Sequence, residues 1–195
     1  MTRPDAASRQ ARAEDLTEQL AGKPLVLVGM MGAGKTTVGR RLATRLNRQF
    51  LDSDEEIERA AQMSIPEIFA QRGEPEFRAG ETRVIARVLK DEGIVLATGG
   101  GAFINAETRA LVKAEGVSVW LKAEADILFE RVSRRSNRPL LKTANPRATL
   151  EKLIEERYPI YAEADVTVVS RDVPQDVVAG DVIAAVLGFL KRQDR

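Results

Sequence analysis

Residues 29–36 carry the strongest chemical signal in the sequence. They read GMMGAGKT and match the phosphate-loop pattern G-x-x-x-x-G-K-[ST], between an apolar run, LVLV, and a helical stretch, TTVGRRLATRL. Glycines let the backbone curl so that successive N–H groups face phosphate oxygens, and the start of a helix adds a positive dipole end. A lysine reaches the β- and γ-phosphates, and a threonine hydroxyl binds Mg²⁺. The motif predicts a phosphate site made by Gly32, Ala33, Gly34, Lys35, Thr36 and Thr37.

Two carboxylates, Asp52 and Asp54, follow the second apolar run. In open parallel sheets, ligands bind beyond the carboxyl ends of the strands, and residues two apart can point the same way. One carboxylate could hold Mg²⁺ or its water, while the other orients or deprotonates an acceptor hydroxyl. The spacing alone equally fits Asp54 as the N-cap of the helix EEIERAAQ, or both residues as solvated turn acids. The neighbouring phosphate loop favours the chemical interpretation.

A triglycine segment and several arginines give weaker signals. Residues 99–101 follow the apolar run IVLAT, where glycines permit close backbone approach to a ligand, although alone they are more typical of a tight turn. Arg78 stands three residues before Glu81, so one helix face can pair them, and most such pairs are surface salt bridges. Arg138 in NRPLL and Arg157 in RYPIY are, by themselves, more typical of exposed cations.

Composition excludes several kinds of chemistry. The 195 residues contain no histidine and no cysteine, which excludes Ser-His-Asp triads, His or Cys metal ligands, thiol nucleophiles and disulfides. Proton transfer must then use a carboxylate, lysine, tyrosine or water. The net charge of +1 provides no bulk attraction for nucleic acid. With no apolar run near the roughly 20 residues of a membrane span and no apolar signal segment at the start, we expect a cytoplasmic protein without nucleic-acid or membrane partners.

The elements that position these residues follow from hydrophobic periodicity. Short and mostly continuous apolar runs predict strands covered on both faces, at residues 25–28, around 50–51, and at 94–97, 117–121 and 166–169. Apolar residues spaced by four predict helices at 38–46 and 178–190. Ser64 and Glu67 resemble a capping box that opens a short helix ending at Gly73, and a further helix carries Val84 and Val88. Alternating strands and helices predict an α/β fold with a parallel sheet.

Two segments fall outside this alternation. Residues 1–22 are polar apart from the pair Leu16 and Leu20, and are predicted as a flexible or partly helical extension outside the fold. Residues 23–195 are then one domain. Residues 133–147 form a long, basic, proline-containing stretch without apolar periodicity, which predicts a functional lid or a disordered excursion.

The ordered set of segments resembles the shikimate kinase family of phosphate-loop proteins. GMMGAGKT, FLDSDEEIE, EFRAGE, the strand leading into GGG, NRPLL and RYPIY match from about residue 24 to the last helix. The resemblance implies a five-stranded parallel sheet in the order 2-3-1-4-5, flanked by helices and carrying a mobile lid. It also implies ATP-dependent phosphorylation of the 3-hydroxyl of shikimate, in the route through chorismate to aromatic amino acids, by an enzyme that uses Mg²⁺ and acts as a monomer.

On the nucleotide side, Lys35 and Thr36 keep the roles already argued. By the resemblance, Arg138 reaches the transferring phosphoryl group as a lid residue, and Arg135 and Arg171 contact the adenine side. Together with residues 32–37, these arginines complete the expected ATP site.

On the acceptor side, the resemblance makes Asp54 the candidate base and gives Asp52 the role of holding Mg²⁺ through water. Arg78 and Arg157 bind the shikimate carboxylate, and Glu81 braces Arg78. The residues expected to contact shikimate are therefore Asp54, Arg78, Gly100, Gly101 and Arg157.

Other functions fit the sequence less well. A GTPase is disfavoured because no N-K-x-D motif occurs, and a transporter ATPase because the chain is short and lacks an LSGGQ-like signature. A related gluconate or nucleotide kinase would keep the loop and lid but would not need Asp54, Arg78, GGG and Arg157 together. A regulatory or nucleic-acid-binding ATPase module is disfavoured by the low net charge and few aromatic residues. ATP consumption with each acceptor added singly distinguishes these alternatives.

Overall fold

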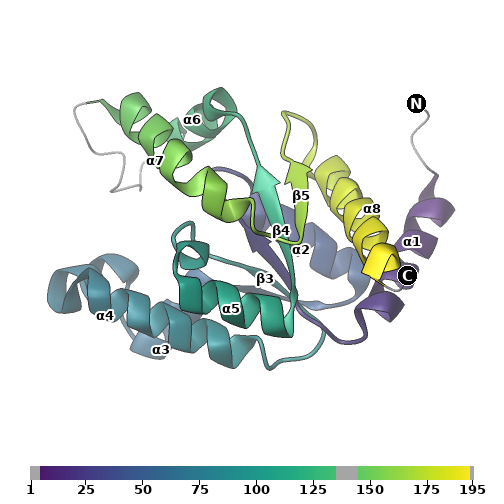
Figure 1. Cartoon of the computed structure of the whole chain (residues 1–195), viewed down its shortest axis with the longest axis horizontal. Helices are drawn as coiled ribbons and strands as arrows, with labels where there is room; N and C mark the ends of the chain where they lie inside the picture. The colour runs from purple at the N-terminus through teal and green to yellow at the C-terminus, as the bar shows by residue number, and fades with distance from the viewer. Residues whose placement is uncertain (1–4, 135–144, 194–195) are drawn as a thin grey trace.

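The computed structural model describes residues 5–134 and 145–193. Its strands form one parallel sheet in the order β2-β3-β1-β4-β5, which confirms the predicted fold class. Figure 1 shows helix α5 in front of the sheet and helix α2 behind it. Arg135 and Arg138 lie outside the described residues, as does most of the segment predicted to be a lid.

The boundaries of the elements agree closely with the hydrophobic runs. The strands are β1 (Leu25–Val28), β2 (Gln49–Asp52), β3 (Ile94–Ala97), β4 (Val117–Lys122) and β5 (Val166–Val169). The helices in the first half of the chain are α1 (Ala6–Leu20), α2 (Lys35–Leu46), α3 (Ser53–Ala61) and α4 (Ile65–Val88). The later helices are the 3₁₀ turn η1 (Ala102–Ile104), α5 (Ala106–Glu115), α6 (Ala125–Ser133), α7 (Pro146–Tyr161) and α8 (Gln175–Gln193).

The place of each strand in the sheet explains its apolar pattern. β1 and β3 are buried at every residue, and β4 at every residue but its last. Helices cover both faces of these inner strands, so no polar face is needed. The edge strand β5 alternates between buried and exposed residues, and β2 is exposed or half-buried throughout. The weak signal of the second strand therefore reflects its position at the edge.

The predicted helical stripes are buried as expected. Val38, Leu42 and Leu46 of α2 are in the core, as are residues 178, 182 and 186 of α8. α2 packs against α8, and it also approaches β2 closely. A Cβ atom on Gly39 would lie 2.6 Å from the ring of Phe50, so this crossing leaves no space for a side chain at residue 39. None of the described helices is long and apolar enough to cross a membrane.

Helix α4 begins and bends where the sequence indicates. The side chain of Ser64 accepts from the backbone N–H of Glu67, whose carboxylate accepts from the N–H of Ser64, which confirms the capping box. Gly73 has φ 78° and ψ 171°, so the helix is interrupted there before it continues to Val88. The interruption separates a capped first part from a second part that carries the predicted Arg78.

Residues 6–20 form helix α1, which corrects the prediction that the first 22 residues lie outside the fold. Asp5 caps the helix by accepting from the N–H of Ser8 at 2.7 Å. Leu16 and Leu20 are fully buried in the main core, where α1 packs on α2 and α8. The hydroxyl of Thr17 lies 3.3 Å from the carbonyl oxygen of residue 46. A few apolar residues on one face thus suffice to dock a helix that is otherwise polar.

Candidate active site

The phosphate loop connects β1 to α2 and depends on its glycines. Gly32 and Gly34 have φ values of 80° and 95°, which residues with side chains rarely adopt. A Cβ on Gly32 would lie 2.8 Å from Val132 Cγ2, and one on Gly34 would lie 2.8 Å from Gln175 Oε1. Gly34 is the N-cap of α2 and makes no side-chain capping hydrogen bond. The helix therefore begins in the manner that suits binding of an anion at its N-terminus.

Lys35 is the first residue of α2, and its side chain folds back over the loop. Its Nζ donates to the carbonyl oxygens of Gly29 at 2.8 Å and Met30 at 2.9 Å. Only 9% of the residue is exposed, so its charge acts in a sheltered place where electrostatic interactions are less screened than in water. This location fits the predicted contact with the phosphates of a nucleotide.

Asp52 links the end of β2 to the phosphate loop. Its Oδ2 accepts from the hydroxyl of Thr36 at 2.9 Å, and its Oδ1 accepts from the backbone N–H of Asp54 at 3.1 Å. Asp52 is thus the N-cap of α3, and the alternative that made Asp54 the cap is wrong. Mg²⁺ prefers oxygen ligands and is bound in phosphate-transfer sites by one or two protein groups plus substrate phosphates. The oxygens of Asp52 and Thr36 fit that requirement.

Asp54 lies in the first turn of α3, close to the triglycine segment and to Glu81. A Cβ on Gly99 would be 2.6 Å from Asp54 Oδ1 and 3.1 Å from Glu81 Oε1. The N–H of Gly99 donates to the hydroxyl of Ser53 at 2.8 Å, which ties the segment to the start of α3. Glycine is required here because two carboxylates approach the backbone closely.

Arg78 and Glu81 form the ion pair that their spacing predicts. Arg78 Nη1 lies 2.7 Å from Glu81 Oε2, and only 2% of the Glu81 side chain is exposed. Burial raises the pKa of Glu81, and Arg78 opposes this effect. Burial also disfavours the charged form of Arg78, but its ion pairs with Glu81 and Glu74 outweigh burial and raise its pKa. The paired guanidinium lies against Gly101, where a Cβ would be 2.6 Å from Nη1.

Arg157 reaches the same segment from α7, which contacts η1 directly after the glycines. Its Nη1 lies 3.4 Å from the carbonyl oxygen of Gly100, to which it donates. Arg78 contacts Gly101 and Arg157 contacts Gly100, so two guanidinium groups meet at one short stretch of backbone. Segments almost 80 residues apart in the chain are thereby brought together around the triglycine.

A cavity of about 390 Å³ connects these parts. Its lining includes eight of the predicted residues, namely Gly32, Gly34, Lys35, Thr36, Thr37, Asp52, Asp54 and Gly100. Ala33 is buried instead, and its carbonyl oxygen accepts from the Ser170 hydroxyl at 2.8 Å. The phosphate loop and the two aspartates thus line a single space. Gly100 connects this space to Arg157 and, through Gly101, to Arg78.

Arg131 of α6 is a cavity residue that the sequence analysis missed. Its guanidinium donates to the Ser170 hydroxyl at 3.0 Å and to the carbonyl oxygen of Arg171 at 2.8 Å. The side chain of Arg171, predicted for the adenine side, instead forms an ion pair with Asp181 of α8 and is not part of the cavity lining. No local pattern distinguishes Arg131 from the chain's many other arginines, because its role depends on β5 lying beside β4.

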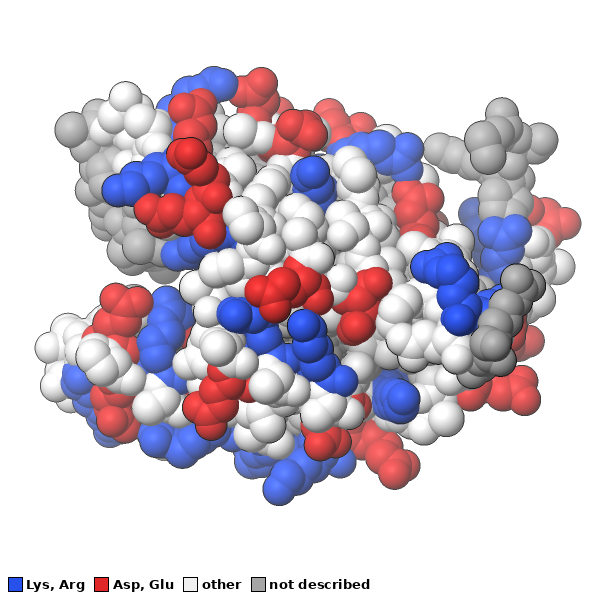
Figure 2. Space-filling model, viewed as in Figure 1, with Lys and Arg blue, Asp and Glu red and all other residues white. Residues whose placement is uncertain are grey.

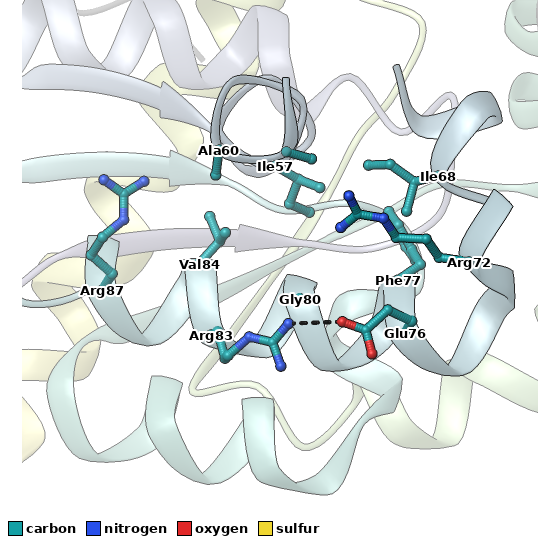
Figure 3. A pocket seen from close by; sticks show the side chains of 11 residues that line it. Ile57, Ala60, Ile68, Arg72, Glu76, Phe77, Gly80, Arg83, Val84 and Arg87 are labelled. Carbon is teal, nitrogen blue, oxygen red and sulfur yellow. Dashed lines mark hydrogen bonds and ion pairs between the residues drawn. The ribbon is translucent and has the colours of Figure 1, made fainter. Parts of the chain in front are cut away.

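A second hollow, of about 320 Å³, lies between α3 and α4 (Figure 3). Its floor is apolar and includes Ile57 and Phe77 of a small hydrophobic cluster. Two guanidinium groups that line it pair with carboxylates, Arg83 with Glu76 at 3.2 Å and Arg87 with Glu56 at 3.0 Å. A third, that of Arg72, lies 3.6 Å from Met63 Sδ. The hollow is therefore part of the packing that holds α3 on α4, and the candidate active site is the larger cavity.

The sheet order, the phosphate loop after the central strand and the carboxylates at the end of β2 define a phosphate-loop kinase of the kind that acts on small molecules. A family model described as shikimate kinase matches residues 31–187. The chain belongs to the shikimate kinase family.

Individual relatives agree with this assignment. The chain is 54% identical to the shikimate kinase of Rhodopseudomonas palustris, over 95% of this chain and 91% of the relative. It is 60% identical to the shikimate kinase of Nitrobacter winogradskyi, over 89% of this chain and 79% of the relative. Among solved structures, it resembles the shikimate kinase from Acinetobacter baumannii in complex with shikimate, with a TM-score of 0.84 and 40% identity, covering 89% of this chain and 97% of that one.

Proposed function

We propose that the protein transfers the γ-phosphoryl group of ATP to the 3-hydroxyl of shikimate, with Mg²⁺, as a step of aromatic amino acid biosynthesis. The observation that carries this proposal is that Asp54 and two glycines of the triglycine segment line the same cavity as the phosphate loop, while Arg78 lies against the third glycine, Gly101. A phosphate loop alone selects no acceptor. Shikimate has a carboxylate and several hydroxyls, so its site requires both cations and a hydrogen-bond acceptor.

On the nucleotide side, the backbone of residues 29–36 and the Lys35 ammonium hold the phosphates in the proposed complex. Asp52 and Thr36 hold Mg²⁺, directly or through water, at the phosphates. When bound, the ion neutralises charge on the β- and γ-phosphates. These groups are fixed before substrate arrives, because Asp52 already bonds Thr36 and the Lys35 side chain already lies in the loop.

On the acceptor side, Arg78 and Arg157 bind the shikimate carboxylate, and Asp54 accepts from the reacting hydroxyl. As the hydroxyl oxygen forms a bond to the γ-phosphorus, the bond from that phosphorus to the β-phosphate oxygen breaks, and Asp54 takes the hydroxyl proton. The products are shikimate 3-phosphate and ADP. Glu81, which is buried and paired with Arg78, fixes the direction of that guanidinium.

The direct test is ATP consumption with shikimate, gluconate, a nucleoside monophosphate or DNA added singly. We expect turnover with shikimate alone, loss of turnover when Mg²⁺ is chelated, and a phosphorus-31 resonance coupled to the proton on carbon 3 of the product. Turnover with gluconate or a nucleotide but not shikimate would refute the proposal. ATP hydrolysis stimulated by DNA would instead support the nucleic-acid module.

A further inference from the structure

Tyr161, the last residue of α7, connects the triglycine segment with the phosphate loop from beneath the surface. The residue is fully buried. Its hydroxyl donates to the carbonyl oxygen of Gly100 in the triglycine segment and lies 3.8 Å from Met30 Sδ in the phosphate loop. Its ring packs against Trp120 at 6.1 Å and Tyr158 at 6.4 Å between centroids. The hydroxyl is therefore held in place by its own surroundings.

The carbonyl that Tyr161 contacts is held differently from its neighbours. The carbonyl oxygens of Gly99 and Gly101 accept backbone N–H groups of the following turn, at 3.2 and 3.1 Å. The carbonyl of Gly100 accepts side-chain donors, the hydroxyl of Tyr161 and the guanidinium of Arg157. Both donors come from α7, one turn apart. The orientation of the middle peptide thus depends on α7 rather than on the turn itself.

The orientation of that peptide matters because a trans peptide unit is planar, so the carbonyl of Gly100 and the N–H of Gly101 point in opposite directions. Glycines on both sides give little steric resistance to rotation of the unit. We propose that Tyr161 is a positioning residue for the acceptor: by holding the Gly100 carbonyl, it directs the Gly101 N–H and the backbone surface against which shikimate lies. This inference rests on the function proposed above.

The Tyr161 hydroxyl can donate this hydrogen bond at every physiological pH. Burial raises the pKa of Tyr161 to about 12, an effect that the charge of Arg157 opposes. The hydroxyl therefore keeps its proton and remains a donor. Because the Tyr161 hydroxyl also donates to the Gly100 carbonyl, that carbonyl does not depend on Arg157 alone. The Arg157 guanidinium can therefore turn to the shikimate carboxylate.

The experiment compares Tyr161→Phe with Tyr158→Phe. Tyr158 is a matched control because it lies on the same helix and in the same aromatic cluster, but its hydroxyl donates to the carbonyl of Ala123, outside the cavity lining. We expect Tyr161→Phe to raise the shikimate KM about fivefold to tenfold, which corresponds to about 1–1.4 kcal/mol. The kcat and the ATP KM should change less than about twofold, as should every constant of Tyr158→Phe.

Several results would overturn the inference. An unchanged shikimate KM in Tyr161→Phe would do so, as would an equal rise in both Michaelis constants, which indicates general loosening of the fold. An equal effect in Tyr158→Phe would assign the change to the aromatic cluster rather than to the Gly100 contact.

A second measurement keeps the inference testable if Tyr161→Phe does not fold. The chain has only two tyrosines, so protein labelled with 3-fluorotyrosine gives one fluorine resonance for each, assigned with Tyr158→Phe. Shikimate added without nucleotide should shift the Tyr161 resonance more than that of Tyr158, and an equal or absent shift would refute the inference. Shikimate turnover by wild type with no effect in either experiment defeats only this inference, whereas absence of wild-type turnover defeats the proposed function.

Discussion

At the scale of single residues, Lys35 places a charge in a sheltered loop, and removing that charge should affect chemistry more than folding. We expect Lys35→Met to lower kcat at least about a hundredfold, because the ammonium stabilises charge on the β/γ-phosphates while Met keeps much of the stem. A coupled enzyme assay measures the turnover, and circular dichroism checks that the variant is folded. Lys90→Met, at an exposed lysine, is the control and should keep full activity. Near wild-type turnover in Lys35→Met would refute the assignment of the phosphate loop.

Asp54 and Asp52 are adjacent carboxylates with different contacts, and their variants should differ accordingly. Asp54→Asn should lower kcat by about 10² to 10⁴, since an amide cannot take the hydroxyl proton, while the calorimetric ATP affinity stays near that of wild type. Asp52→Asn should instead raise the Mg²⁺ concentration needed for half-maximal rate, because this residue bonds Thr36. If Asp54→Asn retained its rate and lost only thermal stability, Asp54 would be structural.

Arg78 offers planar, two-point contact that a lysine cannot replace. We expect Arg78→Lys to raise the shikimate KM about tenfold or more, near 1.4 kcal/mol, with little change in the ATP KM. Arg83→Lys changes an exposed arginine on the same helix and serves as control. Shikimate methyl ester, which lacks the carboxylate charge, should be a poor substrate for wild type. Equal weakening of ATP and shikimate, or efficient use of the ester, would argue against the carboxylate site.

Site residues that cooperate with near neighbours in the sequence could be predicted, whereas those that cooperate with distant residues could not. The phosphate loop and the Arg78–Glu81 pair lie within a few residues and could be predicted from spacing alone. Arg131 could not, because its contacts with Ser170 and Arg171 arise only once β4 and β5 are neighbours. The same holds for the contact between Asp52 and Thr36, which forms only once the end of β2 lies beside the start of α2.

At the scale of elements, two glycines in helix interiors should respond to alanine with opposite signs. A Cβ at residue 39 would meet the ring of Phe50 at 2.6 Å, whereas one at Gly180 would meet only the flexible end of Arg45 at 3.5 Å. We expect Gly39→Ala to destabilise the protein by about 1–3 kcal/mol through overpacking. Gly180→Ala should stabilise it by about 0.5–1 kcal/mol through helix propensity. Urea unfolding measures both changes.

Because α2 and β2 carry Thr36 and Asp52, Gly39→Ala should also weaken the response to Mg²⁺, whereas Gly180→Ala should not. Equal stability of the two variants would mean that Phe50 moves aside without cost, and the close crossing would then have no role in the site.

At the scale of the whole molecule, positive and negative side chains are intermixed on the face shown in Figure 2, as the net charge of +1 suggests. Two anionic substrates are thus attracted by individual cations in the cavity rather than by a field around the protein. The sheet and its order were predictable because strand burial leaves continuous apolar runs. The docking of α1 was not, because its partners on α8 are distant in sequence and its own apolar signal is only a few residues.

The packing of α1 on α8 also has a consequence while the protein is being translated. Helix α1 is synthesised well before α8, yet the two helices pack together, and Lys191 lies 3.3 Å from Asp15 across 176 positions of sequence. Until α8 has emerged, Leu16 and Leu20 are exposed on the side that α8 later buries. A nascent chain in this state is open to proteases and to aggregation. Helix α8 therefore completes the protection of α1, and the nascent chain gains that protection only after α8 has been synthesised.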